Sequence, residues 1–134
     1  MSTRCCVKVV KHFTDKTAEV MLYHHHDGYP EGVGADLVKR SKKFWDPFLN
    51  EGNGGWDIDR VTNFLIKDTT DEYEYTAYNH VDIEYLYTID CDAMTIKCNE
   101  AHWKFGTDEK GEQYSYSEIG KEVEIPGVKY EQSK

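Results

Sequence analysis

The chain has 134 residues, and its 16 Lys and Arg against 25 Asp and Glu give a formal net charge of −9. This length is enough for one domain, so we expect a single domain over residues 1–134 whose tail, from about residue 127, is frayed. The negative charge opposes direct binding to nucleic acid or to an anionic membrane, because every phosphate contact would form against a repulsive mean field. No apolar run reaches the roughly 20 residues of a membrane span. The first residues do not resemble a signal peptide, so we expect a cytoplasmic protein.

Two β-rich runs open the sequence, at residues 3–12 and 18–26, with a short polar connection between them. This pattern predicts an antiparallel hairpin. In the second run, alternation places His24 and His26 on the same face as Leu22 and its apolar neighbours.

A connector of eleven residues, 24–34, follows the hairpin and leads into a helix-like run. Asp27 and Gly28 form a turn dipeptide, and Pro30 pushes Tyr29 towards extended geometry. The strand therefore ends near Asp27, and a helix is predicted to start soon after Gly32.

Amphipathic spacing predicts one helix over residues 33–46 and a shorter one over residues 57–67. Pro47 ends the first helix because proline lacks the N–H that the helix needs. Residues 50–55, rich in glycine and asparagine, are expected to form a loop between the helices.

Alternating apolar residues over 73–90 predict the best strand of the chain, with residues 94–99 as its hairpin partner. Residues 101–105, 113–117 and 122–125 are expected to be extended, with a charged turn at 107–112. The order ββααβββ predicts an α+β fold: a single antiparallel sheet of about five strands with two helices on one face. The predicted core consists of Leu22, Leu37, Phe44, Phe64, Ile83, Tyr85 and Ile96.

A metal site is the sharpest chemical hypothesis that the residues suggest. His24 and His26 share one face of a strand, and His80, Asp82 and Glu84 share one face of another, so neighbouring strands would bring three ligands together. This would make the protein a metal-dependent enzyme with a divalent metal as its cofactor. The alternative is that His24 packs in the core while the two acids face water. No H-E-x-x-H signature is present, and outside this hypothesis no cofactor is expected.

Two stretches, H-D-G-Y-P-E-G-V-G at residues 26–34 and D-I-E-Y-L-Y-T-I-D at residues 82–90, resemble a widespread group of small uncharacterised proteins of bacteria, prophages and phages. The resemblance extends to about Asn99 and implies no activity. It implies a mobile-element setting, and hence a protein that acts on a component of the host cell.

A protein-binding module is the function that we expect, with a host protein as the partner and with the oligomeric state left open. Tyr29 lies at the apex of the connector, and even-spaced carboxylates along the 73–90 strand could occupy a basic groove meant for nucleic acid. The alternative is that the turn is structural and Tyr29 packs back on the helix. The candidate binding residues are Asp27, Gly28, Tyr29, Pro30, Glu31, Glu74, Asp82 and Glu84.

Overall fold

β1 (Cys5–His12) lies inside the sheet and organises the fold. The structure, a computed structural model, describes residues 3–45, 55–69, 72–78 and 80–127. β2 (Thr17–His24) pairs with β1 antiparallel, with Val7 opposite Leu22, so the predicted hairpin is confirmed.

The sheet has six strands in the order β3-β2-β1-β4-β5-β6. The predicted α+β class with one sheet is confirmed, but the prediction of about five antiparallel strands is wrong, because β1 runs parallel to β4 (Tyr85–Asp90). A parallel pair needs a long crossover, and here that crossover contains both helices.

The predicted strand over residues 73–90 is two strands on opposite sides of the β1–β2 pair. β3 (Glu74–Thr76) pairs with β2, and β4 pairs with β1. Between them, residues 77–78 and 80–84, which we call the crossing segment, carry the chain across the sheet. Val81 and Ile83 keep the phase of Tyr85, so alternation alone does not distinguish this crossing from a continuous strand.

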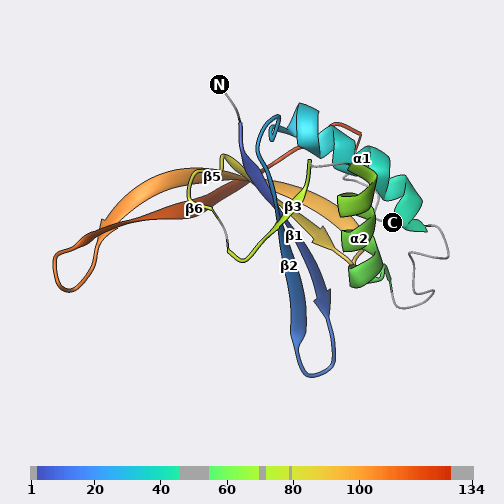
Figure 1. The fold of residues 1–134 in the computed structure, drawn as a ribbon, viewed down its shortest axis with the longest axis horizontal. Coiled ribbons are helices and arrows are strands. Elements are labelled where there is room, and N and C mark those ends of the chain that lie inside the picture. Colours follow the sequence, from blue (N-terminus) through green and yellow to red (C-terminus); the bar gives the residue numbers. More distant parts are fainter. Residues whose placement is uncertain (1–2, 46–54, 70–71, 79, 128–134) are drawn as a thin grey trace.

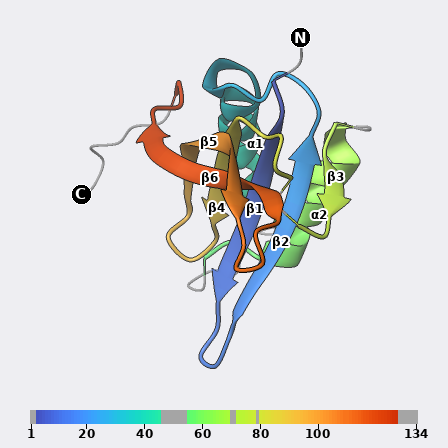
Figure 2. The same ribbon diagram turned by 90° about the vertical axis from the view of Figure 1, so that its left-hand side faces the viewer.

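Both helices cover the same face of the sheet (Figures 1 and 2). α1 (Ala35–Ser41) follows a π-helical turn (Pro30–Gly34) and continues as a 3₁₀ turn (Lys42–Trp45). The helix predicted over 33–46 is therefore present with irregular ends, and its last residue, Asp46, lies outside the described residues. α2 (Ile58–Thr69) matches the second predicted helix, and the loop predicted over 50–55 lies almost wholly outside the described part.

The main core lies between the helices and the sheet. Leu37 of α1 and Val61 and Leu65 of α2 pack with Val7 and Val9 of β1. Of the predicted core residues, Leu22, Leu37, Phe44, Ile83 and Ile96 are buried, whereas Phe64 and Tyr85 are half-buried. None of the helices in the described part is long and apolar enough to cross a membrane.

The opposite face of the sheet carries a much smaller cluster of buried side chains. Its members are Cys6, Tyr23, Ile83, Leu86 and Ala101. Ile83 belongs to the crossing segment, so this segment covers part of the second face of the sheet with a few residues.

β5 (Thr95–Thr107) and β6 (Gln113–Val123) form a long antiparallel hairpin. The segments that the sequence suggested as separate, 94–99 and 101–105, are one strand, and 113–117 and 122–123 also belong to one strand. β5 pairs with β4 as far as Glu100, and beyond Ala101 its pairing partner among the described residues is β6. Residues 101–119, which we call the arm, therefore project from the body, away from the helices (Figure 1).

Candidate functional site

The connector between β2 and α1 is packed against the body through its backbone. The Gly28 N–H donates to the Thr3 carbonyl at 2.8 Å, and the buried Tyr87 hydroxyl donates to the Gly28 carbonyl at 2.7 Å. A Cβ on Gly28 would lie 2.9 Å from the Cβ of Cys5, so only glycine fits this close approach. Gly28 and Pro30 are both buried, and these two candidate binding residues are therefore structural.

Tyr29 stands on the outside of the connector and is 39% exposed. Its hydroxyl donates to Asp27 Oδ1 at 3.2 Å, and this hydrogen bond raises the pKa of Tyr29. The Asp27 carbonyl accepts from the Val33 N–H at 2.7 Å, with Asp27 itself at φ 56°. The ring thus lies over its own turn, close to Gly32, while Asp27 and Glu31 are exposed beside it.

The three predicted carboxylates do not form one row. Glu74 lies on β3, where it contacts His25 at 3.4 Å. Asp82 lies in the crossing segment and pairs with Arg4 at 3.4 Å. Glu84 is exposed at the entry to β4, and in the described part of the chain its carboxylate forms no ion pair. The row expected from the 73–90 strand is absent because that strand is divided.

The predicted metal ligands lie on two faces of the sheet. His24 is buried on the helix side beside the Tyr73 ring, and its Nδ1 lies 2.5 Å from the His26 carbonyl. His80 stacks on Tyr23, on the opposite side. The expected convergence of His24, His26 and His80 is therefore wrong, and across residues 3–45, 55–69, 72–78 and 80–127 no group of three His, Cys, Asp or Glu could hold a metal ion.

Instead, His80 belongs to a stack of rings on the second face of the sheet. It lies between Tyr78 and Tyr23, with ring centroids 4.8 and 4.1 Å away, and His25 meets Tyr23 edge-on at 4.6 Å. Burial and the nearby Asp82 carboxylate raise the pKa of Tyr23 to about 12. The stack fixes the crossing segment on β2 by ring contacts.

All four cysteines are buried free thiols: Cys5, Cys6, Cys91 and Cys98. Burial raises the pKa of each, to about 12 for Cys91 and Cys98. Because the thiolate is the reactive form, these side chains are inert packing groups at neutral pH.

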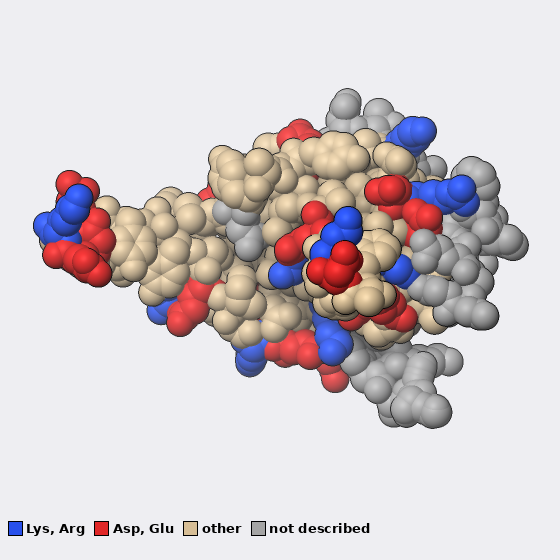
Figure 3. All heavy atoms as spheres, turned by 90° about the horizontal axis from the view of Figure 1, so that it is seen from below, with Lys and Arg blue, Asp and Glu red and all other residues tan. Residues whose placement is uncertain are grey.

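The arm carries the largest group of exposed aromatic side chains among the described residues. The sequence patterns did not indicate it as a candidate site. Trp103 and Phe105 are 55% and 69% exposed, and their rings lie 6.0 Å apart on one face. Tyr114 and Tyr116 lie 5.8 Å apart on the other face. Figure 3 shows the arm as a stalk of mostly uncharged surface, with most of its charged groups gathered at its tip.

The signal in the sequence was a pair of aromatic residues at alternate positions of each strand, and the β5–β6 register places the two pairs on opposite faces of the hairpin. Trp103 pairs with Ser117 and Phe105 with Ser115, whereas Tyr116 pairs with Lys104 and Tyr114 with Gly106. A strand pair that buries one face usually carries polar residues on its other face. Exposed aromatic residues on both faces of the hairpin thus mark an element that the body does not cover.

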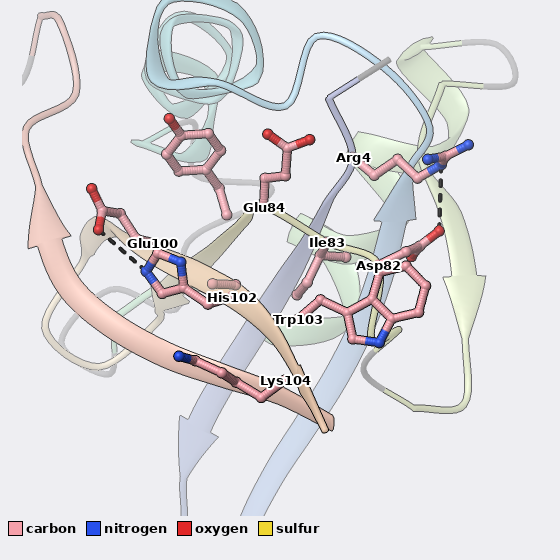
Figure 4. Close-up of a pocket in the computed structure, with 10 residues that line it drawn as sticks. Arg4, Asp82, Ile83, Glu84, Glu100, His102, Trp103 and Lys104 are labelled. Atoms are coloured by element: carbon pink, nitrogen blue, oxygen red, sulfur yellow. Dashed lines mark ion pairs between the residues drawn. The ribbon is translucent and has the colours of Figure 1, made fainter. Parts of the chain in front are cut away.

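A pocket of about 640 Å³ lies at the base of the arm (Figure 4). Its walls are the starts of β1 and β4, the end of the crossing segment and β5; the lining residues are Arg4, Asp82, Ile83, Glu84, Tyr85, Glu100, Ala101, His102, Trp103 and Lys104. Glu84 lies between the Arg4–Asp82 pair and the Glu100–His102 contact of 3.5 Å. Because Trp103 lines this polar pocket and also lies beside Phe105 on the arm, the pocket is continuous with the aromatic face of the arm.

Comparison of the chain with family models, with curated proteins and with solved structures gave no match.

Proposed function

We propose that the protein is a protein-binding module that contacts its partner through the arm, with Trp103 and Phe105 as the anchors. The observation that carries this proposal is their exposure on an element that projects from the body. Soluble proteins seldom leave two adjacent large rings exposed without an interaction to serve. Tryptophan and other aromatic residues also dominate the binding energy of protein interfaces.

The charge of the molecule supports a protein partner over a nucleic acid. Exposed aromatic rings can also stack on bases, but such sites combine the rings with a positively charged groove. The chain carries −9 overall, and the tip of the arm holds Asp108, Glu109 and Glu112 against Lys110. This favours a partner that offers an apolar surface bordered by basic groups.

The resemblance to small proteins of phages and prophages would make the partner a protein of the host cell. On this proposal the connector has a supporting role, since Gly28 and Pro30 are buried and Tyr29 lies over its own turn. The Glu84 carboxylate at the base of the arm extends the contact surface with a negative charge that has no ion-pair partner among the described residues.

The test is a quantitative pull-down from bacterial lysate with the double variant Trp103→Ser/Phe105→Ser. We expect a specific partner of the wild-type protein to be lost, and binding of that purified partner to weaken by at least about 100-fold, as for hot-spot residues. Thermal stability should stay the same because both rings are exposed.

The matched control is Phe13→Ser/Tyr75→Ser, which removes two rings that are 45% and 62% exposed and lie away from the arm, one between β1 and β2 and one on the β3 edge of the sheet. The control should keep the partner. Equal loss in both variants, or equal retention in both, would exclude the arm. Tyr29→Ala distinguishes the connector hypothesis: loss of the partner at unchanged stability would move the contact surface to Asp27, Tyr29 and Glu31.

A further inference from the structure

The two edges of the sheet differ in how well they are protected from pairing with another strand. β3, at one edge, has only three residues, and short edge strands are one of the means by which proteins prevent unwanted pairing. β6, at the other edge, has 11 residues, and in the described part of the chain no strand pairs with its outer side. Alternate residues of such a strand turn both their N–H and C=O groups outwards.

Residues 113–119 of β6 lack the features that usually protect an edge. Their sequence, Q-Y-S-Y-S-E-I, contains no proline, lysine or arginine. The one charged residue, Glu118, contacts Lys104 of the neighbouring strand at 3.7 Å, so its charge is partly neutralised. The irregular register of the β5–β6 pair lies beyond this stretch, near Asn99 and Ala101 of β5.

We infer that β6 pairs antiparallel with β6 of a second copy of this chain, giving a symmetric dimer with one continuous sheet. A two-fold axis near Tyr116 places Tyr116 beside its own counterpart, Ser115 opposite Ser117 and Tyr114 opposite Glu118. This register sets a tyrosine hydroxyl beside a carboxylate and puts no like charges opposite each other. An isologous interface of this kind is the commonest form of homo-oligomer.

The inference does not depend on the proposed function, because it uses the edge of the arm and leaves the face with Trp103 and Phe105 free. The pairing is short, so we expect a modest dissociation constant of about 10–100 μM. Sedimentation equilibrium of the full chain between about 1 and 500 μM covers this range. We expect a reversible monomer–dimer equilibrium.

Tyr116→Lys tests the register because it places two positive charges at the two-fold axis. We expect dimerisation to weaken at least about 10-fold. Tyr116→Glu should weaken it similarly, and an equimolar mixture of the two variants should recover the dimer, because opposite charges then meet at the axis. Tyr75→Lys, on the β3 edge, is the matched control and should dimerise like the wild type.

Circular dichroism first confirms that each variant is folded. A wild-type protein that stays monomeric up to about 500 μM would overturn the inference. So would a dimer that Tyr116→Lys leaves intact, equal weakening by Tyr75→Lys, or a mixture that fails to recover.

Discussion

Single hydroxyl groups tie the connector and the first helix to the body. Tyr87 donates to the Gly28 carbonyl at 2.7 Å, and Tyr73 donates to Asp36 Oδ2 at 2.9 Å. Burial raises the pKa of both tyrosines, so both keep their protons at neutral pH. Two residues that lie far away in sequence thus hold the connector and α1 in place.

Tyr87→Phe should lower the free energy of unfolding by about 1–3 kcal/mol, because the buried Gly28 carbonyl would lose its partner. Urea unfolding monitored by circular dichroism measures this loss. Tyr75→Phe removes a hydroxyl from a ring that is 62% exposed and should change stability by less than about 0.5 kcal/mol. Equal stability of the Tyr87 variant and the wild type would show that the bond does not hold the connector.

At the scale of elements, α1 is short and depends on its packing. It has seven residues, and Leu37 is its one fully buried side chain. Helices of this length are unstable alone in water, so the core contact rather than helix propensity holds α1 in place.

Leu37→Asp should therefore unfold the domain, because it buries a charge in the main core. Lys39→Asp makes a similar change at an exposed position of the same helix and should leave the fold intact. Far-ultraviolet circular dichroism and the dispersion of amide proton NMR signals distinguish the two outcomes. A folded Leu37→Asp variant would mean that α1 is dispensable for the sheet.

For the whole molecule, His24 links stability to pH. Burial is the main cause that lowers its pKa below the usual 6.5. Below about pH 6.5 the unfolded chain binds a proton at His24 while the folded chain does not, so stability is full above this pH and is lost as the pH falls towards the lowered pKa.

We expect the melting temperature to fall between pH 7.5 and 5.5, and to fall less in His24→Gln. His102→Gln, at an exposed histidine of the arm, is the control and should follow the wild type. Differential scanning fluorimetry at the two pH values measures the change. Parallel curves for all three proteins would exclude His24 as the titrating group.

Local signals in the sequence were enough to predict the first hairpin, the two helices and the turn before β5. The split of residues 73–90 was missed because Val81, Ile83 and Tyr85 keep a strand-like phase while the chain crosses from one side of β1 to the other. The parallel β1–β4 pair was missed for a related reason: its partners are set by the crossover and by packing, and neither leaves a periodic pattern.

The predictions about the candidate site divide in the same way, between those that used local sequence and those that required a particular strand order. The turn at Asp27 and Gly28 was correctly read as a strand-to-helix connector, because turn chemistry is local. The row of carboxylates and the histidine site required two strands to be neighbours, and the actual strand order separates them. The exposure of Trp103 depends on where the body ends, which composition alone does not reveal.

The parallel pair also sets the order in which the chain can fold. Cys5 pairs with Tyr85, so β1 obtains one of its two neighbours only after the connector, both helices and β3 have been synthesised. Until then the β1–β2 hairpin has an open inner edge, and contacts of such long sequence separation form slowly. The contacts within the arm are local, so the arm can form as soon as its own residues are available. It is attached to the sheet only when β4 is in place, because β5 pairs with β4. We expect the nascent chain to depend most on protection from aggregation while β1 still lacks β4.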